Sequence, residues 1–249
     1  MSGHSKWSTI KRKKGKADAE RGRIFTRLIR EIVIAARAGG GDIDANPRLR
    51  TAVDSAKAAN MPQNNIDRAV QRGTGELPGV NYEEATYEGY APGGVAILIE
   101  VLTDNRNRTT AELRHLLTKN NGNMGEAGCV SWMFESKGLI VVEKSASDEE
   151  RLLEVALDAG AEDVDLDQES VYEITTAPSD LNAVADVLRS RDIPMTSAEV
   201  IKIPTTQTTP SEKELEQCVR LRQALEDHDD VQAIHDNLDV TDEMLEKFL

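Results

Sequence analysis

The residues best suited to chemistry are cations close to the start of the chain. Six Lys or Arg side chains occur between positions 6 and 16 with no acid among them: Lys6, Lys11, Arg12, Lys13, Lys14 and Lys16. Because no nearby carboxylate can pair with them, we expect them to contact the phosphate groups of a nucleic acid. Trp7 lies in the same stretch and could stack on a base. Positions 1–22 hold too few apolar residues for a core, so we expect a flexible basic arm.

A second set of cations has the spacing of one helix face. Four arginines fall within about 80° of arc when successive residues are about 100° apart, namely Arg23, Arg27, Arg30 and Arg37. Apolar residues fall opposite them. A planar guanidinium can bind two phosphate oxygens at once. The stripe therefore predicts further phosphate contacts, and the alternative is a charged face that meets only solvent. Arg21, the last cation of the expected arm, is a further candidate contact.

A third group follows an expected strand. Arg106 and Arg108 lie in the segment Asp104–Thr109, where a helix should begin. The free N–H groups of a helix N-terminus can bind an anion, so this segment predicts another phosphate contact. The same spacing also suits an ordinary cap. Thr109 and Glu112 have the spacing of a capping box, which places the expected helix at about 108–120.

Enzyme chemistry has little support in the sequence. The four histidines, His4, His115, His228 and His235, show none of the spacings of a zinc site. His228 and His235 lie beside aspartates and could bind a metal, but a solvated acidic loop is the commoner explanation. There is no GxxxxGKS/T phosphate loop and no GxSxG serine motif. We therefore predict a protein that is not an enzyme and has no metal or cofactor.

The charge distribution favours a nucleic-acid partner for one end of the molecule. The 249 residues carry a net charge of −14, but residues 1–75 carry +9, residues 76–144 carry −4 and residues 145–249 carry −19. Acidic surfaces repel phosphate, so binding should be confined to the basic end. No apolar run approaches ~18 residues, which excludes a membrane-spanning segment. Cys129 and Cys218 lie far apart, which indicates a reduced, cytoplasmic protein. The sequence assigns no oligomeric state and is compatible with a monomer.

Three short helices are expected to form a helical domain over residues 23–76. The first spans about 22–38 and ends at three glycines. The second opens at Asn46, a good N-cap, with Pro47 at the first helical position. The third begins at Pro62 and should stop at Gly73.

The rest of the chain predicts two α/β domains. Residues 77–137 contain apolar strands and a helix but lack a closing helix and strand, which residues 205–249 could supply. Residues 138–204 follow the β-α-β-β-α-β order of a ferredoxin-like domain. We therefore expect an α+β fold in which the domain at 138–204 is inserted into a discontinuous, ferredoxin-like middle domain, 77–137 plus 205–249.

Several motifs together resemble one known family. They are Ser2–Trp7, Arg21–Ile32, Asn46–Arg50, Tyr87–Val95, Thr103–Thr109 and Val130–Glu135. These segments closely resemble the YebC/PmpR family, densely over residues 1–137 and more loosely beyond. The resemblance implies three domains around a cleft, one helical and two α/β, and it brings no catalytic residues. Because the matching signature begins at the N-terminus, little room is left for a transit peptide, and we expect a bacterial, cytoplasmic member.

The resemblance also implies a function. Members of this family are generally described as probable transcriptional regulators that bind DNA. A mitochondrial relative is similar to a translational activator for a cytochrome oxidase subunit, and some bacterial members are described as ribosome-associated factors that relieve stalling. We therefore expect a DNA-binding transcriptional regulator, with a translation factor that binds ribosomal RNA as the alternative. The residues do not separate the two, because no base-reading recognition helix is evident in the helical domain.

Overall fold

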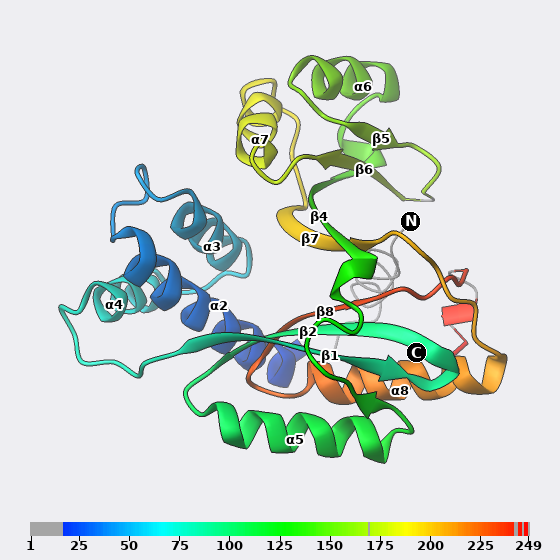
Figure 1. Cartoon of the computed structure of the whole chain (residues 1–249). Helices are drawn as coiled ribbons and strands as arrows, with labels where there is room; N and C mark the ends of the chain where they lie inside the picture. Colours follow the sequence, from blue (N-terminus) through cyan, green and yellow to red (C-terminus); the bar gives the residue numbers. More distant parts are fainter. Residues whose placement is uncertain (1–16, 169, 242–243, 246, 249) are drawn as a thin grey trace. The chain divides into compact units, whose positions relative to one another are not determined.

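The computed structural model describes residues 17–168, 170–241, 244–245 and 247–248. The described chain has an α+β fold with two four-stranded sheets, as the sequence predicts (Figure 1). It divides into two compact units. The first contains the described residues up to Phe134 and from Pro204 onward, and the second contains Glu135–Ile203. The second unit is thus inserted between two segments of the first, which confirms the predicted insertion.

Three helices at the start of the first unit pack around a small apolar core. They are α2 (Ala17–Gly39), α3 (Pro47–Ala58) and α4 (Gln63–Thr74). Asn46 caps α3 as predicted, because its side-chain oxygen accepts the Leu49 N–H at 3.1 Å. One aliphatic side chain of each helix, Ile32, Leu49 or Ile66, is fully buried in this core. The helices therefore pack through apolar faces, as their periodicity indicates.

Gly73 has a different role from the predicted one. It lies inside α4, where an added Cβ would come within 2.6 Å of the Ala36 Cβ and of the Val33 carbonyl oxygen. Only glycine lets α2 and α4 approach so closely. The helix continues to Thr74 and ends with Gly75 in the left-handed region at φ 86°. The predicted stop at Gly73 is therefore wrong, because packing requires this glycine and Gly75 ends the helix.

A sheet with two covering helices forms the rest of the first unit. Its elements are β1 (Glu83–Ala91), β2 (Val95–Thr103), α5 (Arg106–Lys119), β3 (Asn123–Met124), α8 (Glu212–Glu226) and β8 (Val231–Asp236). The strand order is β3-β1-β2-β8, and each strand is antiparallel to its neighbours. α5 and α8 lie on one face (Figure 1), where Leu113 and Leu215 share a core with Ile97 and Ile99 of β2. The C-terminal helix and strand therefore complete this sheet, as predicted. The element order of this domain is β-β-α-β-α-β, however, and differs from the β-α-β-β-α-β order of the expected ferredoxin-like domain.

The second unit follows the predicted β-α-β-β-α-β order. Its elements are β4 (Phe134–Glu143), α6 (Glu149–Asp158), β5 (Asp163–Asp165), β6 (Val171–Thr176), α7 (Leu181–Ser190) and β7 (Ser197–Pro204). The strand order β5-β6-β4-β7 is that of a ferredoxin-like sheet. Ile140, Leu152, Ile174 and Leu188 are fully buried in its own core. The described residues also include three short 3₁₀ helices in connections: η1 (Pro92–Gly94), η2 (Ser131–Met133) and η3 (Lys144–Ala146).

A buried carboxylate joins α2 to the sheet of the first unit. Asp230 lies just before β8, and its side chain is only 2% exposed. Its Oδ1 accepts a hydrogen bond from Arg30 Nη1 of α2 at 2.8 Å. Its Oδ2 accepts one from Arg108 Nη2 at 2.8 Å and one from Thr109 Oγ1 at 2.6 Å, both on α5. The same Arg30 nitrogen also donates to the Leu102 carbonyl oxygen at 3.2 Å. Asp230 therefore connects three elements that are distant in sequence.

The charge of Asp230 is stabilised by these partners. Burial opposes ionisation, but the hydrogen bonds from Thr109 and Arg108 and the charge of Arg30 outweigh it and lower the pKa of Asp230 from 3.8 to about 2. A carboxyl with a lower pKa in the folded than in the unfolded chain stabilises the fold when it is ionised. This stabilisation is present above about pH 4 and is lost as the pH falls towards about 2.

Replacing Asp230→Asn is expected to lower the free energy of unfolding by about 3 kcal/mol at about pH 7, because Arg30 loses its buried counter-charge. The difference from the parent should shrink by about 2 kcal/mol between about pH 4 and pH 2, as the parent carboxyl becomes protonated. Urea unfolding at several pH values measures both quantities. Asp158→Asn, at an exposed position on α6, is the control. A difference that stays constant down to about pH 2, or an equal loss in the control, would show that this carboxylate is not the link.

Candidate nucleic-acid interface

Most of the predicted arm lies outside the described residues. This applies to Lys6, Trp7, Lys11, Arg12, Lys13, Lys14 and Lys16, whose contacts with nucleic acid stay a prediction. Residues 17–22 of the predicted flexible arm instead form the first turns of α2, so the expected start of this helix at about residue 22 is wrong. Arg21, in the second turn, is exposed, and its side chain makes no hydrogen bond or ion pair with a described residue.

The arginine stripe of α2 faces the end of α8 and the loop that follows it. Arg23 Nη2 lies 3.1 Å from Asp227 Oδ1. Arg27 donates a hydrogen bond to the Glu226 carbonyl oxygen, and Arg30 binds Asp230 as described above. These three arginines therefore hold α2 against another segment of the same chain. A phosphate contact by any of them, which stays a prediction, would have to replace these bonds.

Burial distinguishes Arg27 and Arg30 from an ordinary charged face. Burial lowers the pKa of the Arg27 guanidinium from its ordinary value, and the charge of Glu226 opposes this shift. The Arg30 guanidinium lies over the Tyr82 ring, with 5.3 Å between its central carbon and the ring centroid. Arg37, the fourth member of the stripe, donates to the Val80 carbonyl oxygen at 3.3 Å. Each of the three is thus engaged within the first unit.

The two arginines at the start of α5 differ in accessibility. Arg108 Nη2 binds Asp104 Oδ1 at 2.9 Å in addition to Asp230, and these hydrogen bonds, with Asp230 the larger contributor, raise its pKa. Arg106 is exposed, and its guanidinium has no partner among the described residues. Arg106 is therefore the member of this pair that a phosphate can reach.

The predicted capping box at Thr109 is wrong. α5 begins at Arg106, and Asn105 is its N-cap, because the Asn105 side-chain oxygen accepts the Arg108 N–H at 3.1 Å. The Thr109 hydroxyl is buried and donates to Asp230 instead. The spacing of Thr109 and Glu112 predicted a cap, but the Thr109 hydroxyl instead binds the carboxylate of Asp230, which is distant in sequence.

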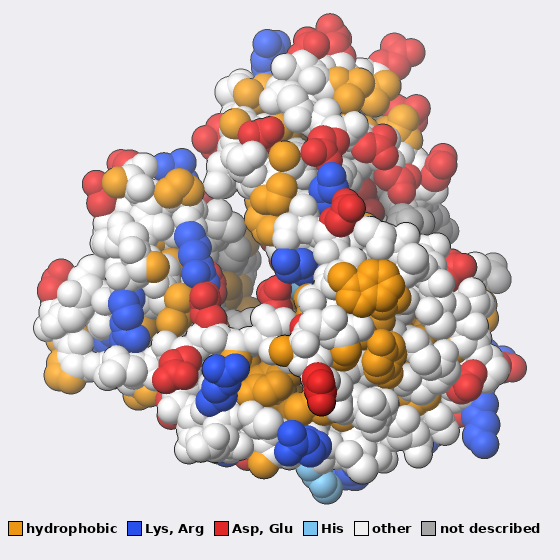
Figure 2. All heavy atoms as spheres, viewed as in Figure 1, with side chains coloured by type: hydrophobic (Ala, Val, Ile, Leu, Met, Phe, Trp, Pro, Cys, Tyr) orange, Lys and Arg blue, Asp and Glu red, His pale blue; other side chains and the backbone are white. Residues whose placement is uncertain are grey.

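α5 also carries cations that the sequence pattern did not single out. The helix contains four Lys or Arg and one Glu in a chain of net charge −14, a local excess that could have identified it. Arg114 and Lys119 are exposed, and neither side chain contacts a described residue. Figure 2 shows cationic and histidine side chains over α5 at the lower edge of the view. Arg106, Arg114 and Lys119 are thus three exposed cations of one helix, here together called the α5 surface.

His228 and His235 lie beside aspartates in the sequence and could bind a metal. His228 Nε2 lies 2.9 Å from Glu112 Oε2, and His228 Nδ1 accepts the Asp230 N–H at 3.1 Å, so ligand atoms of these three residues lie within 4.8 Å of one another. Both Asp230 oxygens, however, are bound by arginine, and these guanidinium groups repel a cation. His235 is buried in β8 and is not part of this group. The group therefore serves the hydrogen-bond network around Asp230.

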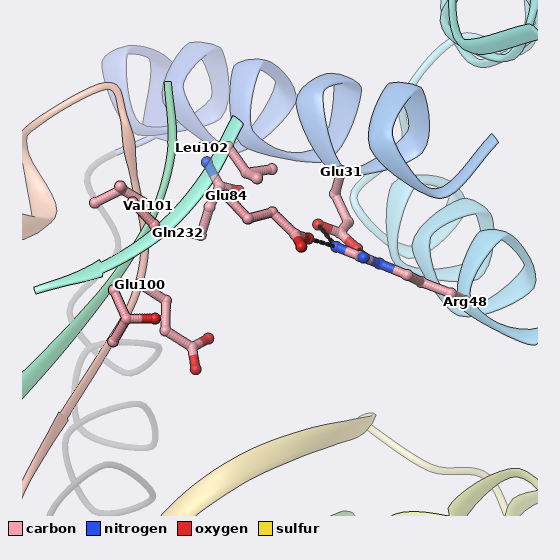
Figure 3. Close-up of a pocket in the computed structure, with 9 residues that line it drawn as sticks. Glu31, Arg48, Glu84, Glu100, Val101, Leu102 and Gln232 are labelled. Atoms are coloured by element: carbon pink, nitrogen blue, oxygen red, sulfur yellow. Dashed lines mark hydrogen bonds and ion pairs between the residues drawn. The ribbon is translucent and has the colours of Figure 1, made fainter. Parts of the chain in front are cut away.

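A pocket of about 230 Å³ lies between α2, α3 and the sheet of the first unit (Figure 3). Glu31, Glu84 and Glu100 line it together with one cation, Arg48. Figure 3 shows the Arg48 guanidinium between Glu31 and Glu84, and it binds both. The hydrogen bond to Glu31 is the main cause of a raised Arg48 pKa. With three acids and one paired cation, this pocket repels phosphate and lies outside the candidate interface.

The remaining groups do not suggest covalent chemistry or membrane insertion. Both cysteines are free, and burial raises the pKa of the Cys218 thiol to about 12 and that of Cys129 above its ordinary value. A thiol with a raised pKa is a poor nucleophile at neutral pH. Among the described residues, no helix combines the length and the apolar composition needed to cross a membrane.

Known proteins are similar to this chain over its whole length. A family model described as the TACO1/YebC protein N-terminal domain matches residues 5–76, and one described as the TACO1/YebC second and third domain matches residues 82–238. A probable transcriptional regulatory protein of Desulforapulum autotrophicum is 58% identical over 244 residues, which are 98% of each chain. A probable transcriptional regulatory protein of Geobacter sulfurreducens is 56% identical over 249 residues, which are 100% of each chain.

A solved structure is also similar. A conserved hypothetical protein from Aquifex aeolicus has a TM-score of 0.83 and 47% sequence identity to this chain, and the match covers 90% of this chain and 92% of that one. The fold, the inserted second unit and these matches lead to one conclusion: the chain belongs to the TACO1/YebC family.

Proposed function

We propose that this protein is a non-enzymatic regulator of gene expression that binds DNA as a transcriptional regulator. The names of its relatives support the regulatory role. The proposed DNA contacts are the cations of the arm, Arg21 beside it, and the α5 surface. Arg23, Arg27, Arg30 and Arg108 contribute by fixing α2 and α5, and they could reach phosphate only if their present bonds opened.

The observation that carries this proposal is the separation of charge. Residues 1–75 have a net charge of +9, whereas residues 135–203, which form the second unit, have 17 acids and 6 Lys or Arg. Phosphate is attracted to the first region and repelled by the second, so the protein would bind DNA in one orientation. The cations that remain exposed and without a partner on α5 add to the attractive side.

Replacing Lys11, Arg12, Lys13 and Lys14 together by glutamine is expected to weaken binding to every DNA sequence, because phosphate contacts do not distinguish bases. The slope of log K against log salt should become shallower by about 4 on duplex DNA. Fluorescence anisotropy with a labelled duplex at several salt concentrations measures both. Identical affinities of parent and variant at every concentration would remove the arm from the interface.

The double variant Arg106→Gln/Arg114→Gln should make the same slope shallower by about 2, because each side chain is expected to contact one phosphate. Neither side chain has a described partner, so stability should not change. Arg191→Gln/Lys213→Gln removes the same charge at two exposed positions elsewhere and is the matched control. If the control loses as much affinity, net charge rather than the α5 surface explains the effect.

The physiological target can be identified by crosslinking in living cells, followed by sequencing of the attached DNA and RNA. A transcriptional regulator should give discrete chromosomal sites upstream of genes. The purified protein should then prefer these sites over random duplex by at least ~10³ at physiological salt. Ribosomal RNA as the dominant product would overturn the transcriptional assignment in favour of a ribosome-associated translation factor.

A further inference from the structure

Trp132 is the most exposed large apolar side chain in the described part of the protein. Its exposed fraction is 69%, whereas Val130 and Phe134, two residues to either side, are buried. An indole ring that stays in water does not gain the free energy that burial of its apolar surface would give. The loop thus exposes Trp132, its largest side chain. Val130 and Phe134 hold the loop on the sheet, where they pack with Ala96 and Leu98.

A carboxylate fixes the shape of the loop that carries Trp132. Glu88 of β1 is buried and accepts N–H groups of Gly128, Val130 and Ser131 at 2.7–2.8 Å. Burial opposes ionisation of Glu88, but these N–H groups outweigh it and lower its pKa. The carboxylate is therefore charged at neutral pH and keeps three backbone groups in place. This arrangement holds the backbone of the loop at three points.

The polar edge of the indole is already used inside the loop. Trp132 Nε1 donates to the Cys129 carbonyl oxygen at 3.1 Å, and the Tyr90 hydroxyl donates to the same oxygen at 3.2 Å. What remains for a ligand is the flat apolar face of the ring. Because the ring is held by the loop, little rotational freedom is lost when a ligand packs on it.

We propose that Trp132 stacks on an unpaired base of the nucleic acid that the protein binds, an inference that rests on the proposed function. Stacking uses the flat face of an aromatic side chain and tolerates every base, because each base has a π face. Bases inside a duplex are stacked on one another and do not offer this face. The expected ligand is therefore a single strand, or a nucleotide that is unpaired within a longer nucleic acid.

The surroundings of Trp132 favour a base over a protein surface. Protein interfaces contain a contiguous apolar patch with several buried anchors. In the described loop, Met133 is partly buried, Ser131 is exposed and polar, and Val130 and Phe134 are buried. Trp132 is therefore the one large apolar side chain that this loop exposes. A single ring is enough for one base, which is the unit of stacking recognition.

Intrinsic fluorescence gives a direct test, because Trp7 and Trp132 are the two tryptophans of the chain. Trp7→Phe leaves Trp132 as the sole indole. Titration with an unlabelled single-stranded DNA of about 12 nucleotides should quench its emission, as expected for base stacking. The fully paired duplex of the same sequence should bind through phosphate contacts and leave the emission nearly unchanged.

Affinity gives a second, independent readout. In anisotropy titrations with the same single strand, Trp132→Leu should lower the affinity by about 5- to 150-fold, and Trp132→Phe should retain part of it. Leu157→Ala, at an exposed apolar position on α6, is the matched control and should bind like the parent. All three variants should unfold in urea like the parent, because each replaced side chain is exposed.

The outcomes separate this inference from the proposed function. If bound single strand leaves Trp132 emission unchanged, or if Trp132→Leu binds as tightly as the parent, stacking is overturned. The proposed function then still stands, provided that neutralising the arm weakens binding. If the parent protein binds neither single strand nor duplex, both proposals are overturned.

Discussion

The connection between the three-helix core and the sheet of the described first unit depends on a buried carboxylate. Asp230 has to be paired because an isolated carboxylate in a low-dielectric interior is costly, and its partners come from α2 and α5. The three-helix core and the sheet core are separate apolar clusters. Polar contacts therefore carry much of the connection between them, including Arg23 with Asp227 and Arg48 with Glu84.

Features with local causes could be predicted from the sequence. The Asn46 cap depends on a few consecutive residues, and the insertion follows from the order of strands and helices. Arg23, Arg27 and Arg30 were visible as a stripe, but two of their acceptors lie 199 residues later, which no local pattern reveals. The capping box and the stop at Gly73 failed for the same reason, because distant atoms decide both positions. Trp132 had no periodic signal, since its exposure results from the loop that Glu88 holds.

The arginines show that the number of charges on a helix does not tell whether they are available to a ligand or pair with another segment of the same chain. Arg30 and Arg106 are identical in chemistry, yet one is enclosed beside a carboxylate and the other is exposed with no described partner. Burial sets their roles: an enclosed pair is unavailable to solvent ions, whereas an exposed cation can exchange counterions for phosphate. The second unit has 17 acids and 6 Lys or Arg, so by itself it would repel phosphate.

The position of the insertion sets an order of events during synthesis. β2 pairs with β1, its neighbour in sequence, but its other edge pairs with β8, as in the register of Ile97 with Asp236. Residues 135–203 are contiguous and have their own core, so they can assemble while translation continues. Until α8 and β8 emerge, the earlier sheet has an open edge and an uncovered apolar face. A chain truncated within α8 would therefore contain a folded second unit and an incompletely folded first unit. Proteases would be expected to cleave the incompletely folded unit.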